Sequence, residues 1–397
     1  MFKQFRNWLA NNRRWLFSRY TKDSQATQEP ESTLIELPQE IRNKLIDRIE
    51  ALASNPDEQS AIADKLDEAF ELWRANPENA NNSIIILSSP VTAVSRILTE
   101  TLENWAAQKQ ISLRPLPLKA RPDRIDTIKS KLKYYLEKEF TETVGTDRSE
   151  VLVIPNLNWC FLRSLEGLDG IEYLQSRLYD GFKDRFWIIG AGQVAWEYLN
   201  SVSSIKAYCS EVFTLPTLSS EQLQEWFDPI VNDLEIAFDN PRIDQKILDG
   251  DQDNKTNYFD RLADISDGSS IIAVQSFLKS LGYQEVEQEE TLPDYIQEYE
   301  PQKLSKKVII AQIPQLPELP ALEQTDRYLL YSLLLHGDLT ISALAESLGD
   351  PQAEVQARVQ VLRHQGVVQQ KEKIIKINPI HYPNIKKELT SNNFAIN

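Results

Sequence analysis

The segment SSPVTAVS, residues 88–95, lies between a short apolar run and a helical pattern, which is where a phosphate-binding loop would occur. In a loop of the form G-x-x-x-x-G-K-[ST], the glycines let backbone N–H groups surround the phosphates. The Lys neutralises them and the Ser or Thr holds Mg²⁺. Here Ser88 and Ala93 stand at the Gly positions and Val94 at the Lys position, so only Ser95 keeps a motif residue type. The segment has the position of a phosphate loop without most of its chemistry.

A nucleotide-hydrolysing site also needs carboxylates that hold Mg²⁺ and orient water, normally at the end of a second apolar strand. The matching run VLVI, residues 151–154, is followed by Pro155 and Asn156. We therefore expect no hydrolysis, no catalytic residue and no bound cofactor. Weak ATP binding through the N-terminal end of the helix, at residues 90–95, is left open, because the helix dipole and its free N–H groups remain.

The other residue types that could do chemistry are few and isolated. The three histidines, His336, His364 and His381, are each singly placed near the C-terminus, which is more typical of packing or surface residues than of ligands. Cys160 and Cys209 lack metal-type spacing, so we expect ordinary reduced thiols. No metal site is predicted.

The elements around the loop read as an α/β domain at residues 80–217. Five short apolar runs indicate strands, at 84–87, 111–113, 151–154, 186–189 and 212–215. Helical patterns fall between them, at 95–108, 126–140, 170–179 and 195–201. Apolar strands that alternate with helices predict a parallel sheet covered on both faces.

The flanking segments are mostly helical. Residues 38–79 predict two amphipathic helices, and residues 218–283 read as a wholly helical segment with Ser219 or Ser220 as its first N-cap. Residues 284–321 are acidic and Pro-rich, which favours a linker with one strand at 307–311. Residues 322–390 read as three helices and a β-hairpin, with Gly349 closing the second helix and Gly366 before the hairpin. This order predicts a winged helix-turn-helix.

In this order and spacing the chain resembles the AAA+ and STAND superfamily of P-loop ATPases, over about residues 80–385. The phrase EVFTLPTLSSEQLQEWF, residues 211–227, resembles the last core strand and the entry to the helical lid of such ATPases. RFWIIGAG, 185–192, resembles the strand of the first sensor, without its polar residue. ADISDGSSIIAVQSFL, 263–278, resembles the second-sensor helix without its Arg. The resemblance implies a P-loop NTPase-like (AAA+) core with a helical lid, the C-terminal winged helix, and assembly with itself or with an active relative.

The first 22 residues differ from the rest of the chain. They hold six Lys or Arg and no acid, whereas the whole chain has a net charge of −16. As a helix they would form an apolar face beside basic residues, which suits a lipid headgroup layer. Contact with a partner protein and disorder are the alternatives. The residues that would contact the membrane or partner are Phe2, Phe5, Trp8, Leu9, Arg13, Arg14, Trp15 and Leu16. Residues 23–37 read as a polar linker.

The winged helix offers few groups for DNA. The third helix carries Arg358 and Arg363 beside an acid and three amides, and the hairpin adds Lys371 and Lys373. A DNA reader normally makes more phosphate contacts than these, and the acidic body repels nucleic acid. The pattern favours protein contact over DNA binding.

Taken together, these features predict a non-catalytic AAA+/STAND-like scaffold or regulatory protein. It would be cytoplasmic and held peripherally at the inner face of a membrane, where it would bind a partner protein or its own copies. A divergent ATP-binding ATPase and a winged-helix DNA-binding regulator are the alternatives.

Overall fold

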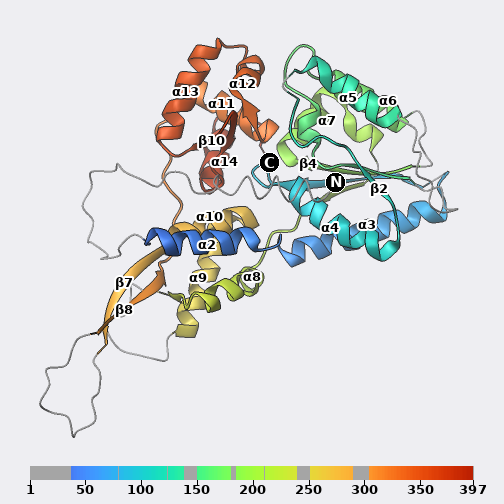
Figure 1. Cartoon of the computed structure of the whole chain (residues 1–397). Coiled ribbons are helices and arrows are strands. Elements are labelled where there is room, and N and C mark those ends of the chain that lie inside the picture. Colours follow the sequence, from blue (N-terminus) through green and yellow to red (C-terminus); the bar gives the residue numbers. More distant parts are fainter. Residues whose placement is uncertain are drawn as a thin grey trace, which may run out of the picture. The chain divides into compact units, whose positions relative to one another are not determined.

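The computed structural model describes residues 37–78, 80–122, 124–137, 150–179, 185–209, 211–238, 251–288 and 304–396 (Figure 1). The chain divides into two compact units. The first, called the sheet unit, comprises Ser54–Leu218, Ser269–Ile272 and Leu316–Asn397. The second, called the hairpin unit, comprises Met1–Ala53, Ser219–Gly268 and Ala273–Gln315.

The sheet unit is built on a five-stranded parallel sheet, which confirms the α/β class expected from the sequence. Its strands are β1 (Ser83–Ser88), β2 (Leu113–Pro115), β3 (Glu150–Ile154), β4 (Arg185–Gly192) and β5 (Glu211–Thr214). Their order across the sheet is β2-β3-β4-β1-β5, with β1 pairing β4 on one side and β5 on the other. β2 begins where the predicted strand at 111–113 ends, because Leu113, and not Ile111, is the first residue to pair with β3.

Helices cover both faces of this sheet, as Figure 1 shows. The helices are α3 (Pro56–Ala75), α4 (Val94–Lys109), α5 (Asp126–Glu137), α6 (Asp169–Tyr179) and α7 (Gln193–Ser203). Ile84 and Ile86 of β1 face a cluster with α3 and α4, whereas Ile85 and Leu87 face a cluster with α5, α6 and α7. Successive side chains of a strand point to opposite faces, so both clusters need a continuous apolar run.

Local signals set where α3 begins. Asn55 is its N-cap and accepts hydrogen bonds from the N–H groups of Asp57 and Glu58, while Pro56 occupies the first turn. A side-chain oxygen at the N-cap satisfies amides that have no partner inside the helix. The buried face of α3 then packs Ile62, Leu66, Phe70 and Trp73 in the cluster on its side of the sheet.

The C-terminal part of the sheet unit has the elements of a winged helix, as expected. Its helices are α11 (Gln324–His336), α12 (Ile341–Leu348), α13 (Gln352–His364) and α14 (Tyr382–Ser391). Its antiparallel sheet has the order β10-β11-β9, from β9 (Leu339–Thr340), β10 (Val368–Lys371) and β11 (Ile374–Ile377). Gly349 closes α12 at a φ of 76°, a conformation that favours glycine. The short β9 and the helix α14 were not predicted.

The hairpin unit departs from the sequence prediction. It contains α2 (Gln39–Ala51), α8 (Ser220–Asp233), α9 (Asp251–Ser266) and most of α10 (Ser270–Ser280). Ser219 is the N-cap of α8 and forms a capping box with Gln222, which confirms the predicted start. Segment 284–321 is not a linker with one strand, because two long strands pair in it and beside it.

These strands are β7 (Leu281–Gln288) and β8 (Leu304–Ala311), which pair antiparallel from Leu281–Ala311 to Gln288–Leu304. A third strand, β6 (Ala237–Phe238), pairs with β8 and interrupts the segment expected to be wholly helical. The Glu-rich composition hid β7 because strand propensity is low for Glu, and pairing with β8 overrides it.

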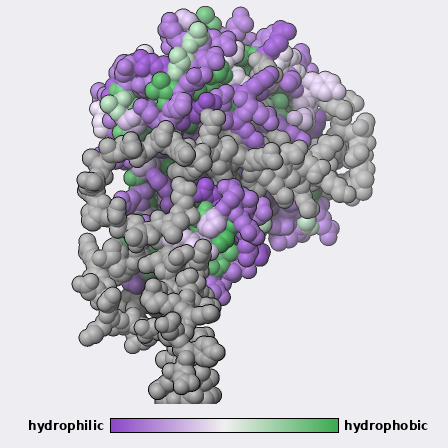
Figure 2. Space-filling model, turned by 60° about the vertical axis from the view of Figure 1, so that its left-hand side comes forward, coloured by the Kyte–Doolittle hydropathy of each residue, from purple (hydrophilic) through white to green (hydrophobic). Residues whose placement is uncertain are grey.

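The surface of the described residues is mainly hydrophilic in the view of Figure 2, and the hydrophobic areas on it are small. Within the described ranges, no helix combines the length and apolar character needed to cross a bilayer. The residues predicted to contact a membrane or partner, Phe2 to Leu16, lie outside the described part of the chain.

Candidate functional site

The turn that replaces the phosphate loop joins the end of β1 to the start of α4. Ser88 is the last residue of β1 and Val94 is the first of α4, so residues 89–93 form the turn. Ser88 is buried, and its hydroxyl donates to the carbonyl of Ser89 at 3.2 Å. This strand, turn and helix order is the one the sequence predicted, with Ser88 and Val94 where the motif has Gly and Lys.

The backbone of this turn is hydrogen-bonded to itself. The Thr92 N–H donates to the Ser89 carbonyl at 3.0 Å, and the Val94 N–H donates to the Thr92 carbonyl at 2.9 Å. Pro90 has no N–H to offer. A phosphate loop binds through backbone N–H groups that point at the anion. Pro90 and Thr92 of the turn, and Val94 at the start of α4, therefore have no N–H directed to a ligand.

Val94 belongs to the hydrophobic core. It is 2% exposed and lies in the cluster that contains Ile97 and Leu98 of α4 and Phe70 of α3. Of its neighbours, Ala93 is exposed and Ser95 is half-buried. Ala93 is the N-cap of α4, but its side chain makes no capping hydrogen bond. A Val at this place contributes burial where a Lys would have presented a cation to phosphate.

Pro155 and Asn156 follow β3, and their contacts are with the protein backbone. Asn156 is the N-cap of the short helix η1 (Leu157–Cys160), and its side-chain oxygen accepts from the Asn158 N–H at 3.1 Å. The Pro155 carbonyl approaches β4 so closely that a Cβ at Gly190 would lie 2.6 Å from it. The residues at the expected carboxylate positions thus shape the end of the sheet.

Asn158 connects the sheet to the winged helix. It is 3% exposed, and its side-chain oxygen accepts from the Gly192 N–H at 3.0 Å at the end of β4. Its side-chain amide donates to the carbonyl of Leu335 in α11 at 3.4 Å. A Cβ at Gly192 would lie 3.0 Å from that amide nitrogen. The GAG sequence at 190–192 therefore allows close packing at this edge.

Arg121 binds backbone carbonyls of both parts of the sheet unit. On the core side its guanidinium donates to Phe161 at 3.0 Å and to Asn158 at 2.5 Å. On the winged-helix side it donates to Asp338 at 2.6 Å and to His336 at 3.3 Å. Burial lowers the pKa of Arg121 to about 10, so the side chain is still charged at neutral pH. Hydrogen bonds from a charged donor are the stronger kind.

Arg163 and His336 complete this contact, which we call the Arg121 joint. The Arg163 N–H donates to the imidazole Nε2 of His336 at 3.3 Å, and its guanidinium donates to the carbonyl of Ser347 at 3.0 Å. His336 is fully buried, with its ring 4.9 Å from that of Phe161. Burial, with the positive charges of Arg121 and Arg163, holds the pKa of His336 well below its usual range. It is therefore a neutral packing residue.

The sequence did not single out Arg121, Asn158 or Arg163. Arg121 and Arg163 lie in irregular segments and Asn158 in the short helix η1, none of them in a motif. Their partners in α11, in α12 and at Asp338 are remote in sequence. Of the three histidines, only His336 belongs to this joint. Burial raises the pKa of Cys160 and of Cys209 to about 12, so neither thiol is set up as a nucleophile.

The candidate DNA-contact residues of the winged helix are partly engaged within the protein. Arg358 of α13 forms an ion pair with Glu323 and lies 3.6 Å from Asp326. Arg363 donates to the side chain of Gln370 in β10 at 3.2 Å. Lys371 is half-buried and Lys373 is exposed. Besides Arg358 and Arg363, α13 contains no Lys or Arg.

Comparison with known proteins gives matches in structure alone. No model of a protein family matches the chain, and no curated protein matches its sequence. The RuvB Holliday junction branch migration motor of Thermotoga maritima is similar at 14% identity, covering 83% of this chain and 94% of its own, with a TM-score of 0.33. Cdc6p of Pyrobaculum aerophilum is similar at 12% identity, covering 85% and 95%, with a TM-score of 0.36.

The ORC2 protein of Aeropyrum pernix is a third example, at 12% identity, covering 84% and 94%, with a TM-score of 0.33. Similarity at this level carries no argument about activity. The assignment of the fold rests on the parallel order β2-β3-β4-β1-β5, the helices that follow it, and the C-terminal module. These elements form a parallel α/β fold with a C-terminal winged helix.

Proposed function

We propose that this chain is a non-catalytic scaffold or regulatory protein with an AAA+-like fold, and that it acts through contacts with other proteins. The observation that carries the proposal is the β1–α4 turn. Val94 is buried in the core at the position of the phosphate-binding Lys, and the amides of Thr92 and Val94 are bonded within the turn. Pro155 and Asn156 supply no carboxylate for a metal ion.

The use of the sheet edge supports the same proposal. Ligands of open α/β sheets bind beside the carboxyl ends of the strands. At β3 and β4 that edge is occupied by the Arg121 joint, which fixes the winged helix to the core. Where an enzyme of this class would bind its ligand, this chain packs its own winged helix. We therefore assign the binding of other proteins to the remaining surface.

The test is a calorimetric titration of the full chain with ATP, with and without Mg²⁺, together with an ATP-hydrolysis assay. We expect no binding in the micromolar range and hydrolysis at the level of the buffer. Micromolar, Mg²⁺-dependent binding would overturn the proposal and favour a divergent ATPase. Binding of a duplex at low salt would instead favour the winged-helix DNA-binding regulator.

A second part of the proposal concerns residues 1–22. Their six cations, the absence of acids and the aromatic residues among them support recruitment to an anionic membrane surface. In co-sedimentation with vesicles of phosphatidylcholine and phosphatidylserine, the full chain should pellet, and deletion of residues 1–22 should abolish pelleting. Vesicles of phosphatidylcholine alone are the control. Equal pelleting of the deletion variant would refute this part and leave the segment as a protein contact.

A further inference from the structure

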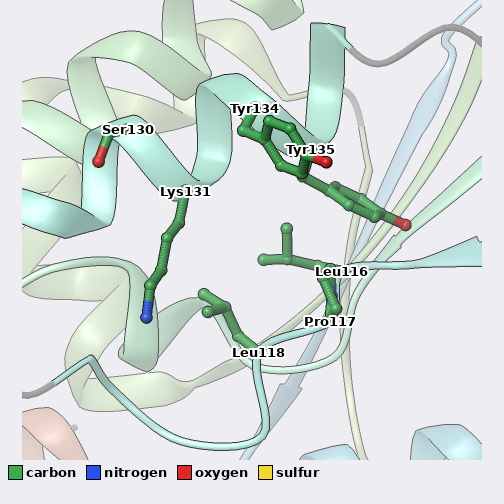
Figure 3. A pocket seen from close by; sticks show the side chains of 7 residues that line it. All are labelled: Leu116, Pro117, Leu118, Ser130, Lys131, Tyr134 and Tyr135. Carbon is green, nitrogen blue, oxygen red and sulfur yellow. The ribbon is translucent and has the colours of Figure 1, made fainter.

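A cavity lies beside β2, the edge strand of the parallel sheet, and shares no lining residue with the β1–α4 turn or the Arg121 joint. Its volume is about 330 Å³, at the lower end of the range of ligand pockets, about 300–1,000 Å³. We call it the α5 pocket. In Figure 3 the aliphatic side chains lie opposite α5, and two tyrosines lie at one end. The lining residues are Leu116, Pro117, Leu118, Ser130, Lys131, Tyr134 and Tyr135.

One wall of the α5 pocket is held in place by hydrogen bonds within the sheet unit. The Tyr135 hydroxyl donates to the carbonyl of Pro115, and the Arg114 guanidinium donates to the carbonyl of Tyr135. The Arg114 guanidinium carbon also lies 4.8 Å from the centre of the Tyr135 ring. Leu116 is 4% exposed, whereas Tyr134 is 72% exposed. A fixed apolar wall beside an exposed aromatic ring suits an apolar side chain of another molecule, because the wall needs little ordering on binding.

The polar groups of the α5 pocket differ in whether the protein already bonds them. The Ser130 hydroxyl donates to the Thr127 carbonyl at 3.0 Å, within α5. Lys131 is exposed and extends along the pocket, with its amine at the end away from the tyrosines (Figure 3). Lys119, which follows the lining residue Leu118 directly, is exposed too. Among the described residues neither lysine forms an ion pair, so both ammonium groups are available to an anionic partner.

These features select the chemistry of the occupant. Two ammonium groups beside an apolar pocket complement a short segment that carries carboxylates around one aromatic or bulky aliphatic side chain. A long polyanion such as nucleic acid needs many cations along its path, and beyond the two lysines it would meet a chain with a net charge of −16. We propose that the α5 pocket binds a short acidic segment of a partner protein. The apolar side chain of that segment enters the pocket, and its carboxylates pair with Lys131 and Lys119.

The binding experiment uses the full-length protein and fluorescein-labelled synthetic heptapeptides, followed by fluorescence anisotropy. Each peptide has three glutamates on either side of a central Trp, Tyr, Phe or Leu. We expect at least one of the four to bind, and replacement of its central residue by Ala, or of its glutamates by glutamine, to weaken binding at least tenfold. Affinity should fall as salt is raised, because lysine–carboxylate pairs at a surface are screened. No binding by any of the four, or equal binding by the glutamine peptide, would overturn the proposal.

Charge reversal tests the location of the bound peptide. In the variant Lys119→Glu with Lys131→Glu, affinity for the acidic peptide should fall at least tenfold, and a peptide with lysines in place of the glutamates should now bind. The control variant is Lys133→Glu with Lys206→Glu, which changes the net charge of the chain equally. Lys133 lies on α5 outside the lining, and all four lysines are exposed. The control should keep the affinity for the acidic peptide and gain none for the basic one.

The apolar part of the contact is tested by Tyr134→Ala. This variant should weaken binding of the acidic peptide by the same factor at low and at high salt, since it removes contact area and no charge. Unchanged affinity would place the central residue of the peptide outside the pocket and overturn the proposal. The substituted side chains are exposed, so each variant should keep the native circular dichroism spectrum.

Three further results would overturn the assignment of the occupant. Peptide binding that survives reversal of Lys119 and Lys131 would place the peptide elsewhere. Binding of a labelled single-stranded oligonucleotide that is tighter than that of every peptide and requires the same lysines would make the pocket a nucleic-acid site. Self-association of the full chain in analytical ultracentrifugation, abolished by the same double reversal, would assign the surface to a second copy of this chain.

Peptide binding at the α5 pocket rests on the proposed function, since it supplies a surface for the protein contacts of the scaffold, but the two can fail separately. Micromolar ATP binding together with peptide binding would remove the non-catalytic role and keep the α5 pocket as a binding site. Absence of peptide binding together with absence of ATP binding would remove the α5 pocket alone.

Discussion

Two places at the carboxyl edge of one parallel sheet, the β1–α4 turn and the Arg121 joint, are closed in different ways. At the turn, Val94 contributes to the apolar core and the amides of Thr92 and Val94 bond to their own turn. At the joint, Arg121 and Asn158 remain polar, and their donors are matched to carbonyls on both sides. In an open α/β sheet this edge is the usual place for a ligand. Here residues of the chain itself occupy both places.

The difference follows from the cost of burying polar groups. A buried cation or amide is tolerated only where its hydrogen bonds are made, whereas an aliphatic side chain gains from burial with no such requirement. The joint can therefore keep Arg121 because the winged helix supplies carbonyls. At the turn, Val94 lies in the apolar cluster with α3 and α4, where an aliphatic side chain is compatible with burial.

The largest expected effect comes from breaking the joint. Arg121→Ala leaves four carbonyls without their donor at the interface between the core and the winged helix. We expect the free energy of unfolding to fall by about 3–5 kcal/mol, measured by urea denaturation. Arg121→Lys should restore little of it, because an ammonium cannot reach the same set of carbonyls.

The matched control is Arg124→Ala, since Arg124 is exposed and, among the described residues, its guanidinium pairs with the nearby Asp126 alone. This variant should unfold at the urea concentration of the native chain. If Arg121→Ala also unfolded at the urea concentration of the native chain, the Arg121 joint would contribute no stability.

A second buried polar group, the carboxyl of Glu58, has few hydrogen-bond partners. Glu58 of α3 is 4% exposed and accepts hydrogen bonds only from the Ser270 hydroxyl among the described side chains. Burial raises its pKa from 4.5 to about 7, an effect partly offset by that hydroxyl. The folded chain thus binds this proton more tightly than the unfolded chain. The stabilisation is complete below pH 4.5 and is lost as the pH rises to about 7.

Glu58→Gln should remove this pH dependence while keeping the acceptor for Ser270. At pH 8 the variant should be more stable than the native chain by about 3 kcal/mol, from a shift of roughly two and a half units at 1.36 kcal/mol each. Urea denaturation between pH 4.5 and 8 measures it. Glu68→Gln, at an exposed position of α3, is the control. A native pH profile for Glu58→Gln would show that Glu58 is not buried as a neutral acid.

Val94→Lys restores the motif residue at the turn. It should lower the free energy of unfolding by about 2–3 kcal/mol through the lost burial of Val, without producing ATP binding. The reason is that the Thr92 N–H remains bonded to the Ser89 carbonyl and the N–H of residue 94 to the Thr92 carbonyl. Thermal unfolding and the calorimetric titration measure the two parts. Micromolar ATP binding by this variant would mean that one residue, and not the whole turn, separates the chain from a nucleotide-binding protein.

The smallest effect is expected on the winged helix. Arg358→Ala should not change the mobility of a DNA duplex incubated with the full chain at low salt, because Arg358 is already paired with Glu323. Lys373→Ala, at an exposed position of the hairpin, is the companion variant. A shift with the native chain that either variant removes would show that this module reads DNA after all.

Much of the fold was predictable from local patterns. The strands at 84–87, 151–154 and 186–189, the helix start at Ser219 or Ser220, of which Ser219 is the N-cap, and the helix end at Gly349 were all confirmed, because each depends on residues close together in sequence. The hairpin of β7 and β8 was not predicted, since β7 contains Glu285 and Glu287, a residue type depleted in strands, and its partner β8 lies beyond the intervening segment. The turn at 88–95 was located, but its hydrogen bonding was not.

The sequence by itself determined which groups are missing at the turn, since no fold can return a Lys to position 94 or a carboxylate to 155 and 156. The tertiary structure decided which residues occupy that edge of the sheet in place of a ligand. Arg121 and the Asp338 carbonyl are 217 positions apart, and no local pattern relates them. The physical reason is that a cation is kept in a partly buried place by the geometry of the carbonyls around it, and that geometry exists only after the winged helix has packed on the core.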